Sequence, residues 1–101
     1  MAFIFIYVTN PNDKTAKKIT AHLLKANLIA CANIFPIKST YMWKGTVKQD
    51  KEIVTILKAN KKNYSKIKKE IKKIHPYEVP CITKIDVSSN KEFDLWVNSF
   101  H

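Results

Sequence analysis

The sequence predicts a single α+β domain in which two β-α-β units build one antiparallel sheet. Four segments have strand patterns, either alternating or apolar throughout. Three other segments place their apolar residues at the spacing of a helix face. These segments follow one another in the order β-α-β-β-α-β-α, and the 101 residues are enough for one domain, residues 1–101, and no more.

The first expected element is a strand over residues 2–9 that is apolar on both faces. One face carries Phe3, Phe5 and Tyr7, and the other carries Ile4, Ile6 and Val8. Strands of this kind lie inside a sheet and are covered on both sides. The rest of the fold therefore has to supply two covers for this strand.

A helix is expected to follow from about Pro11 to Asn27. Asn10 or Asp13 can cap its start, and asparagine is a common residue at a helix end. The apolar stripe of this helix consists of Ala16, Ile19, Leu23 and Ala26. Its lysines lie outside the stripe, so one face of the helix is expected to point into the core.

The next two strands are expected to form a long hairpin that projects beyond the small domain. The second strand lies within residues 29–43, where Pro36 indicates an edge strand or a bulge because proline cannot donate to a strand ladder. The third strand runs from about residue 51 to residue 59. Gly45, the only glycine, lies near the hairpin turn.

The remaining elements are a helix over residues 63–74, a strand over residues 80–87 and a short last helix. The proline after His75 ends the longer helix, because proline disfavours a helical residue before it. Ser89 and Glu92 have the spacing of a capping box at the start of the last helix.

The complete order is that of the ferredoxin-like fold, β-α-β-β-α-β, with an extra short C-terminal helix. In this fold the strand order is 4-1-3-2, and both long helices cover one face of the sheet. The last helix is too short to cover the other face, so we expect a subunit interface there and hence a homo-oligomer. The strand order also places Cys31 and Cys81 on opposite edges, roughly 14 Å apart, beyond the reach of an intrachain disulfide.

The formal net charge of +10 has two interpretations. It is typical of a protein that binds an anionic partner. However, all 18 basic residues are lysine, and Lys, Ile and Asn share A/T-rich codons, so a biased genome gives the same composition without any partner.

The composition and the strand patterns exclude several function classes. The lack of arginine excludes the arginine fork with which acylphosphatases of similar fold hold phosphate, and one glycine excludes glycine-rich nucleotide motifs. The third strand lacks the stacking aromatics with which RNA-recognition domains bind bases. We therefore expect no sequence-specific nucleic-acid binding.

The apolar start of the chain does not have the pattern of a signal peptide, because no basic residue precedes it and no small-residue cleavage site follows it. Nothing in the sequence is long and apolar enough to span a membrane. We therefore expect a cytoplasmic location and no membrane partner.

The segment from His75 to Pro80 holds an imidazole, a phenol and a carboxylate together with two prolines. One interpretation is a rigid turn in which His75 caps the preceding helix. The other is a functional site, because the prolines restrict the backbone and hold these side chains at a low cost in entropy.

The sequence also resembles a known family. The matching residues are the segment 28–34 (Leu-Ile-Ala-Cys-Ala-Asn-Ile), Ser39, Tyr41-x-Trp43-x-Gly45, Glu52, Lys58, the segment 75–80 (His-Pro-Tyr-Glu-Val-Pro) and Trp96. With these residues in order over nearly its whole length, the chain resembles the CutA divalent-cation-tolerance family. The blocks around Cys31 and His75 are the most specific part of the match.

The resemblance implies a ferredoxin-like fold, a tight homotrimer similar to the PII signalling proteins, and a binding or sensing role without an established reaction. It also implies that copper or another divalent metal ion, or a small ligand, binds in a cleft between subunits, with no cofactor required. The implied metal ligands are Cys31 and His75. The implied ligand-binding residues are Tyr41, Trp43, Glu52, Lys58, Tyr77 and Glu78.

One departure from the family pattern bears on this cleft. Cys81 stands where the family has glutamate. A thiol in place of a carboxylate makes a metal site softer and favours copper(I) or zinc.

Two other functions stay open. A small enzyme that uses Cys31 or His75 would need a base next to its nucleophile, and the sequence does not place one there. A lysine-driven nucleic-acid-binding module would show a steep salt dependence. We expect a binding protein and not an enzyme.

Overall fold

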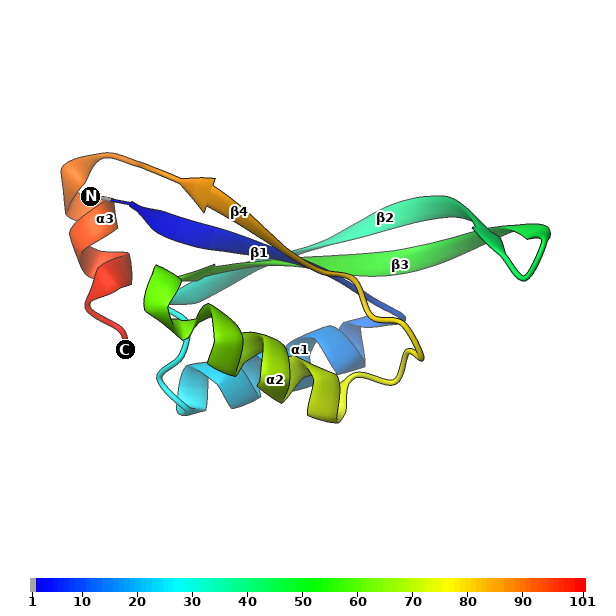
Figure 1. Cartoon of the computed structure of the whole chain (residues 1–101), viewed down its shortest axis with the longest axis horizontal. Helices are drawn as coiled ribbons and strands as arrows, with labels where there is room; N and C mark the ends of the chain where they lie inside the picture. The colour runs from blue at the N-terminus through cyan, green and yellow to red at the C-terminus, as the bar shows by residue number, and fades with distance from the viewer. Residues whose placement is uncertain (1) are drawn as a thin grey trace.

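The computed structural model describes residues 2–101 and contains the predicted elements in the predicted order (Figure 1). The strands are β1 (Phe3–Asn10), β2 (Cys31–Trp43), β3 (Thr46–Ala59) and β4 (Ile82–Val87). The helices are α1 (Asp13–Lys25), the 3-10 turn η1 (Lys61–Asn63), α2 (Tyr64–Ile74) and α3 (Lys91–Asn98). The predicted α+β, ferredoxin-like fold with a short C-terminal helix is confirmed.

The four strands form one antiparallel sheet in the order β2-β3-β1-β4, which is the predicted order counted from the other edge. Ile6 of β1 lies opposite Leu57 of β3, and Leu57 lies opposite Ala32 of β2. Each β-α-β unit therefore crosses one intervening strand. The first strands of the two units, β1 and β3, are antiparallel, and the two units continue toward opposite edges of the sheet. Right-handed connections in both units therefore place both long helices on the same face.

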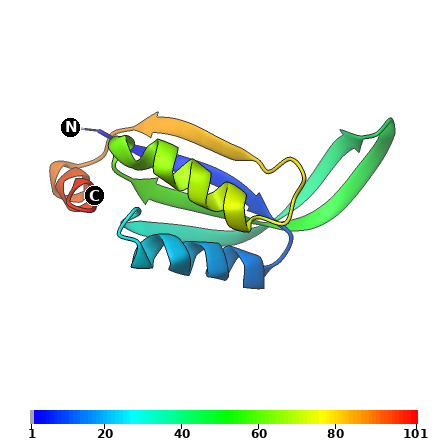
Figure 2. The ribbon, with the colours of Figure 1, turned by 60° about the horizontal axis from the view of Figure 1, so that its bottom comes forward.

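The main core lies between the sheet and the two long helices, which Figure 2 shows side by side on one face. Its buried side chains are Ile4, Ile6, Val8, Ile19, Leu23, Ile29, Leu57, Ala59, Ile67 and Ile71. Each of the large aliphatic side chains contributes about 1.5–3 kcal/mol when it leaves water. The apolar stripes predicted for the helices around residues 19–23 and 67–71 are the surfaces that make this contact.

The second face of the sheet is only partly covered by its own chain. At one end α3 packs on it, and the Phe93 ring lies 5.8 Å from that of Phe3. Toward the two edges of the sheet Phe35 on β2 and Ile85 on β4 stay 37% and 45% exposed. The last helix is therefore too short to cover this face, as the sequence indicated.

The hairpin of β2 and β3 extends away from the domain (Figure 1). It turns at Lys44 and Gly45, whose φ angles of 50° and 78° are those of the two-residue turn that matches strand twist. The pairing of β1 with β3 ends at Asn10 and Ile53, so the outer half of β3 has only β2 beside it. Pro36 lies in the edge strand β2 within continuous pairing, which confirms the edge position and not a bulge.

Two predicted helix caps are wrong by one or two residues. Asn12, and not Asn10 or Asp13, caps α1, because its Oδ1 accepts a hydrogen bond from Thr15 N at 2.8 Å. Asn10 still belongs to β1, where it is fully buried and donates through Nδ2 to a backbone carbonyl of β3 at 3.0 Å. β1 extends to Asn10, beyond its apolar residues, and α1 therefore begins later than predicted, at Asp13.

The start of α3 differs in a similar way. Asn90 is the cap residue, and no capping box forms between Ser89 and Glu92. The backbone N–H of Ser89 instead donates to Asp94 Oδ1 at 3.2 Å. Asp94 is buried, so it ties the entry of the helix to its first turn more tightly than the exposed Glu92 would.

The third strand begins earlier than predicted, and the fourth strand begins later. β3 begins at Thr46 and not at residue 51, because the polar residues after the turn pair with β2. β4 begins at Ile82 and not at residue 80.

Within residues 2–101 no helix combines the length and apolar character that a membrane crossing needs.

The packing of α1 is tested by two neighbouring leucines. Leu23 is fully buried, whereas Leu24 is 44% exposed. We expect Leu23→Ala to lower the free energy of unfolding by about 2–5 kcal/mol, because it leaves a cavity in the core. Leu24→Ala is expected to change it by about 0.5 kcal/mol or less. Urea unfolding at one fixed protein concentration measures both, and equal losses would contradict the orientation of α1.

Candidate functional site

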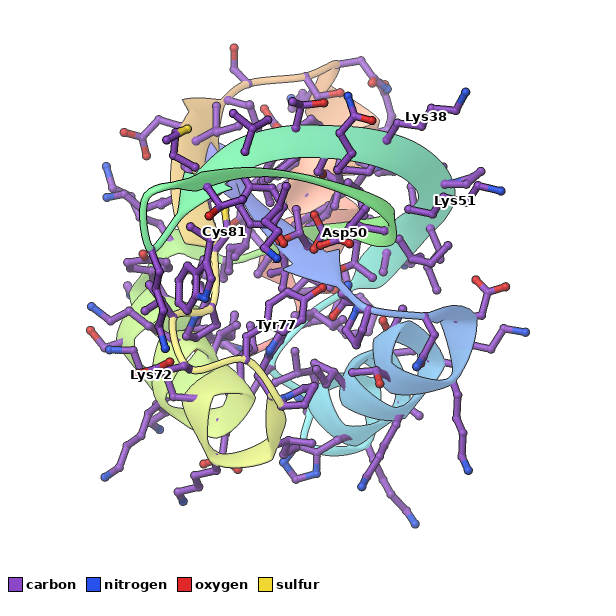
Figure 3. All side chains as sticks on the ribbon, turned by 90° about the vertical axis from the view of Figure 1, so that its right-hand side faces the viewer. Lys38, Asp50, Lys51, Lys72, Tyr77 and Cys81 are labelled. Atoms are coloured by element: carbon purple, nitrogen blue, oxygen red, sulfur yellow. The ribbon has the colours of Figure 1, made fainter. Side chains whose placement is uncertain are left out.

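A cleft of about 750 Å³ lies where the hairpin meets the segment between α2 and β4. We call it the hairpin cleft. Five of the six predicted ligand-binding residues line it, namely Tyr41, Trp43, Glu52, Tyr77 and Glu78. Its other walls come from Thr9, Ser39, Thr40, Lys48, Asp50, Val79 and Cys81. Figure 3 looks onto the end of the molecule that carries it, with Asp50, Tyr77 and Cys81 labelled.

The tightest polar contact of the cleft joins Tyr77 to Glu52. The Tyr77 hydroxyl donates to Glu52 Oε2 at 2.5 Å, and Glu52 as a residue is only 8% exposed. Burial, and then this hydrogen bond to the carboxylate, raise the pKa of Tyr77 far above its usual range. The phenol therefore stays protonated and acts as a fixed donor.

A second tyrosine and carboxylate repeat this arrangement nearby. The Tyr41 hydroxyl donates to Asp50 Oδ2, and this bond raises the pKa of Tyr41. Asp50 and Glu52 are two residues apart on β3, so their side chains leave the strand on the same side. Asp50 was not among the predicted residues, although its position two residues before Glu52 is a signal for a shared face.

The cleft is acidic although the whole chain is strongly basic. Asp50, Glu52 and Glu78 face one lysine, Lys48, whereas the chain carries a formal net charge of +10. Within residues 2–101 none of these three carboxylates forms an ion pair. Aromatic rings and carboxylates together favour a positively charged group, through the faces of the rings and through charge.

His75 does not line the cleft but holds two of its residues, Thr9 and Tyr77, in place. The residue is 8% exposed, its Nε2–H donates to Thr9 O at 2.8 Å, and its Nδ1 accepts from Tyr77 N–H at 3.2 Å. The ring also lies against the Tyr77 ring, with centroids 4.7 Å apart. These contacts fix one tautomer and join the end of α2 to β1 and to Tyr77. The prediction that His75 caps the preceding helix is therefore wrong for its ring, which bonds to β1, whereas its neighbours Tyr77 and Glu78 line the cleft.

Cys31 and Lys58 lie elsewhere in the subunit. They are opposite each other in β2 and β3, and Lys58 extends over the rings of Phe5 and Phe93. Burial raises the pKa of the Cys31 thiol, and the charge of Lys58 partly offsets this. In the register, Lys58 pairs with Phe5, four residues along β1 from the Thr9 that His75 contacts. At about 3.3 Å per residue this is a separation of roughly 13 Å along the strand.

The predicted metal site therefore does not fit one chain. Both ring nitrogens of His75 are engaged, and Cys31 lies outside the cleft. In the part of the chain that the structure describes, residues 2–101, no group of three or more His, Cys, Asp and Glu side chains is arranged to hold a metal ion. The cysteine that does line the cleft is Cys81, whose Sγ lies 3.5 Å from Thr83 Oγ1.

The hydrogen bond between Tyr77 and Glu52 is expected to make the free energy of unfolding depend on pH in the alkaline range. The folded state holds the Tyr77 proton more tightly than the unfolded state, whose tyrosines titrate near about pH 10. The folded state therefore binds more protons above that pH, and the free energy of unfolding falls as the pH rises. In Tyr77→Phe we expect a smaller fall between about pH 9 and pH 11.

Tyr64→Phe is the control, because Tyr64 lies outside the cleft and its hydroxyl meets only the Ile82 carbonyl at 3.5 Å. Urea titrations at each pH measure the free energies. A fall that is unchanged in Tyr77→Phe would show that the bond to Glu52 does not form.

The comparisons with known proteins agree with the fold and with these motifs. Residues 4–99 match the family model of the CutA1 divalent ion tolerance protein. A divalent-cation tolerance protein CutA from Pyrococcus horikoshii is 40% identical over 95 residues, which are 93% of each chain. Its counterpart from Thermotoga maritima is 42% identical over 86 residues, or 85% of each chain.

Solved structures give the same result. A protein from Archaeoglobus fulgidus, described as a periplasmic divalent cation tolerance protein, has a TM-score of 0.91 at 37% identity and covers 96% of this chain and 95% of its own. A PII-like CutA from a Nostoc species has a TM-score of 0.90 at 28% identity, with 98% and 97% covered. The chain belongs to the CutA1 divalent ion tolerance protein family.

Proposed function

We propose that the chain forms a homotrimer and acts as a PII-like binding or sensing protein, with a small ligand bound in the hairpin cleft at a boundary between subunits. The observation that carries this proposal is the position of the cleft. It lies between the projecting hairpin and the segment that joins α2 to β4, in a subunit whose second sheet face its own chain leaves partly open. An assembly that covers this face would bring a second chain next to the cleft.

Both edges of the sheet support a contact between subunits. Ile34 and Phe35 on β2 are each 37% exposed, and Ile85 on β4 is 45% exposed. Exposed apolar edge strands accept further strands. A contact from the β2 side of one subunit to the β4 side of the next is heterologous, and it closes into a ring without free ends. The number three rests on the family resemblance and on the PII-like description of the Nostoc relative.

The residues of the cleft support a binding role more than an enzymatic one. Cys31 and His75, the two residues of the enzyme hypothesis, lie apart, and the ring nitrogens of His75 are both occupied. The carboxylates of Glu52 and Asp50 accept from tyrosines that keep their protons. Such groups fix a ligand by charge and by hydrogen bonds, and none of them is poised as a nucleophile with its base.

A divalent metal ion, with copper first, is the second candidate ligand. Relatives of 33–42% identity bear the name divalent-cation tolerance protein. Because residues 2–101 of one chain offer no complete ligand set, a metal site would need residues from two subunits. The cytoplasmic location expected from the sequence is part of this proposal, and cell fractionation tests it against the periplasmic description of the Archaeoglobus relative.

The assembly is tested by its mass. We expect light scattering at micromolar concentration to give about three times the chain mass of 11.7 kDa. Phe35→Glu is expected to produce smaller particles, because it places a charge on the open apolar edge. Leu24→Glu, a charge at an exposed leucine of α1, is expected to keep the trimer mass. A monomeric native chain would contradict the proposed assembly, and a dimer would contradict only the number.

The ligand site is tested by calorimetry with Cu(II), Zn(II) and tetramethylammonium. We expect Glu52→Gln to weaken the binding of any cation held in the cleft by roughly 10- to 100-fold, because it removes a negative charge whose attraction for a nearby cation is worth a few kcal/mol, on the order of one to two factors of ten after desolvation. Glu92→Gln, at an exposed carboxylate on α3, is the control. A metal ion held by Cys31 instead would be lost in Cys31→Ser and kept in Glu52→Gln, which would move the site away from the cleft.

A further inference from the structure

The net charge of the chain is concentrated on one layer of the fold. We call α1, η1 and α2, residues Asp13–Lys25 and Lys61–Ile74, the helix layer. It contains 11 of the 18 lysines but only two of the eight acidic residues, so it carries nine of the ten formal net positive charges. The rest of the chain is close to neutral, and the hairpin cleft is acidic.

Within residues 2–101, nine of the eleven lysines of this layer form no ion pair, and the other two are Lys61, paired with Asp86, and Lys73, paired with Glu70. All eleven except Lys68 are exposed, and in Figure 3 long side chains extend outward from both helices, Lys72 among them. The two acidic residues are Asp13 and Glu70. Asp13 lies in the first turn of α1, where the helix dipole favours a negative charge.

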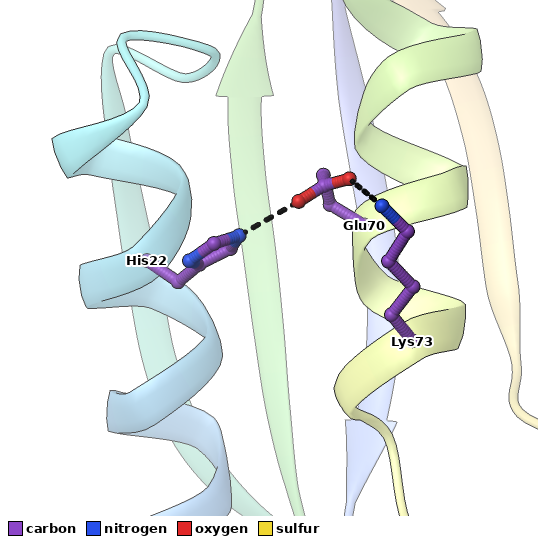
Figure 4. Close-up of polar contacts among 3 residues, drawn as sticks. All are labelled: His22, Glu70 and Lys73. Carbon is purple, nitrogen blue, oxygen red and sulfur yellow. Dashed lines mark hydrogen bonds and ion pairs between the residues drawn. The ribbon is translucent and has the colours of Figure 1, made fainter.

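Glu70 is already neutralised within the layer. Its carboxylate bridges the two helices, with His22 Nε2 at 2.9 Å from one oxygen and Lys73 Nζ at 3.0 Å from the other (Figure 4). These two contacts lower the pKa of Glu70, so it stays charged and is fully used. The outer surface of the helix layer therefore presents lysine charge without an unpaired carboxylate between the two helices.

This arrangement is not what a solvated helix surface needs. Exposed helices commonly alternate acidic and basic residues three or four positions apart, because such pairs stabilise the helix. On α2 and η1 the exposed residues at this spacing are instead lysines, namely Lys62, Lys66, Lys69 and Lys72. They repel one another. A biased genome sets how many lysines a chain has, but it does not remove acidic residues from one layer and leave them in another.

We propose that the helix layer binds the phosphate backbone of nucleic acid without discrimination between bases. The four lysines from Lys62 to Lys72 extend over ten residues, or about 15 Å of helix. A duplex strand carries a phosphate about every 3.4 Å along its axis, so this row matches four or five successive phosphates. The proposal depends neither on the ligand of the cleft nor on the number of subunits.

A phosphate backbone fits this surface better than a membrane does. Helices that lie on membranes combine a basic face with an apolar face that inserts among the lipids. Here the apolar faces of both helices are in the core, with Ile19, Leu23, Ile67 and Ile71 buried. Leu24 is the only exposed large apolar side chain of the helix layer. The surface also lacks aromatic side chains that could stack on bases, because Tyr64 is partly buried beside the core.

The test compares two variants of equal net charge by fluorescence anisotropy with labelled 20-base-pair DNA duplexes of two unrelated sequences. The first variant changes Lys62, Lys66, Lys69 and Lys72 to Gln. The second changes four exposed lysines outside the layer, Lys38, Lys44, Lys51 and Lys91, to Gln. Circular dichroism verifies that both variants fold.

For the native chain we expect the same Kd for both duplexes, weakening by about 100-fold between 50 and 200 mM salt if four phosphates are contacted. The helix-layer variant is expected to lose most of this salt dependence and to bind at least about 10-fold more weakly at 50 mM salt. The second variant is expected to bind as the native chain does.

Four outcomes would overturn the proposal. They are an absence of micromolar binding at low salt, equal losses in the two variants, a clear preference for one duplex sequence, and binding to phosphatidylserine vesicles in place of DNA. Equal losses would show that only net charge matters, and vesicle binding would assign the layer to a membrane surface.

Discussion

The whole architecture depends on a central strand that needs cover on both of its faces. Ile4, Ile6 and Val8 of β1 are fully buried under the two long helices, whereas Phe5 and Tyr7 on the other face stay partly exposed. The right-handed connections of the two β-α-β units commit both helices to one face. The other face then has only α3, which reaches one end of the sheet. The chain therefore leaves apolar edges open, and these are the surfaces that the proposed assembly would bury.

The hairpin cleft depends on the same strand. β1 ends at Asn10, and beyond that point the hairpin continues without its support. The carbonyl of Thr9, one residue before the end, accepts the hydrogen bond from His75, and His75 in turn holds the backbone of Tyr77. Tyr77 then reaches the hairpin through Glu52. A short chain of contacts thus carries the geometry of the packed core into a cleft that is largely open to solvent.

The sequence predicted the elements, the strand order and five of the twelve residues that line the cleft, because these follow from periodicity and from motifs that keep their spacing. It did not predict which residues meet across the fold. His75 and Cys31 belong to the two most specific blocks, yet one is buried with both nitrogens bonded and the other lies at the far end of β2. Lys58 lies outside the cleft because β3 is 14 residues long and extends well beyond one site. Asp50 was missed because its role comes from the diagonal reach of Tyr41, which depends on the twist of the hairpin.

The distribution of charge links the two surfaces of the molecule. The chain has a formal charge of +10, yet three of its eight acidic residues line the cleft, and 11 of its 18 lysines lie on the helix layer. Each arrangement has an energetic cost: the lysines repel one another, and Glu52 keeps a buried carboxylate with a single tyrosine donor. A partner of opposite charge relieves both costs, a cation at the cleft and a polyanion at the helix layer. Because none of the lysines of the helix layer lines the cleft, the two partners would use different surfaces, and each would lower the electrostatic penalty for binding the other.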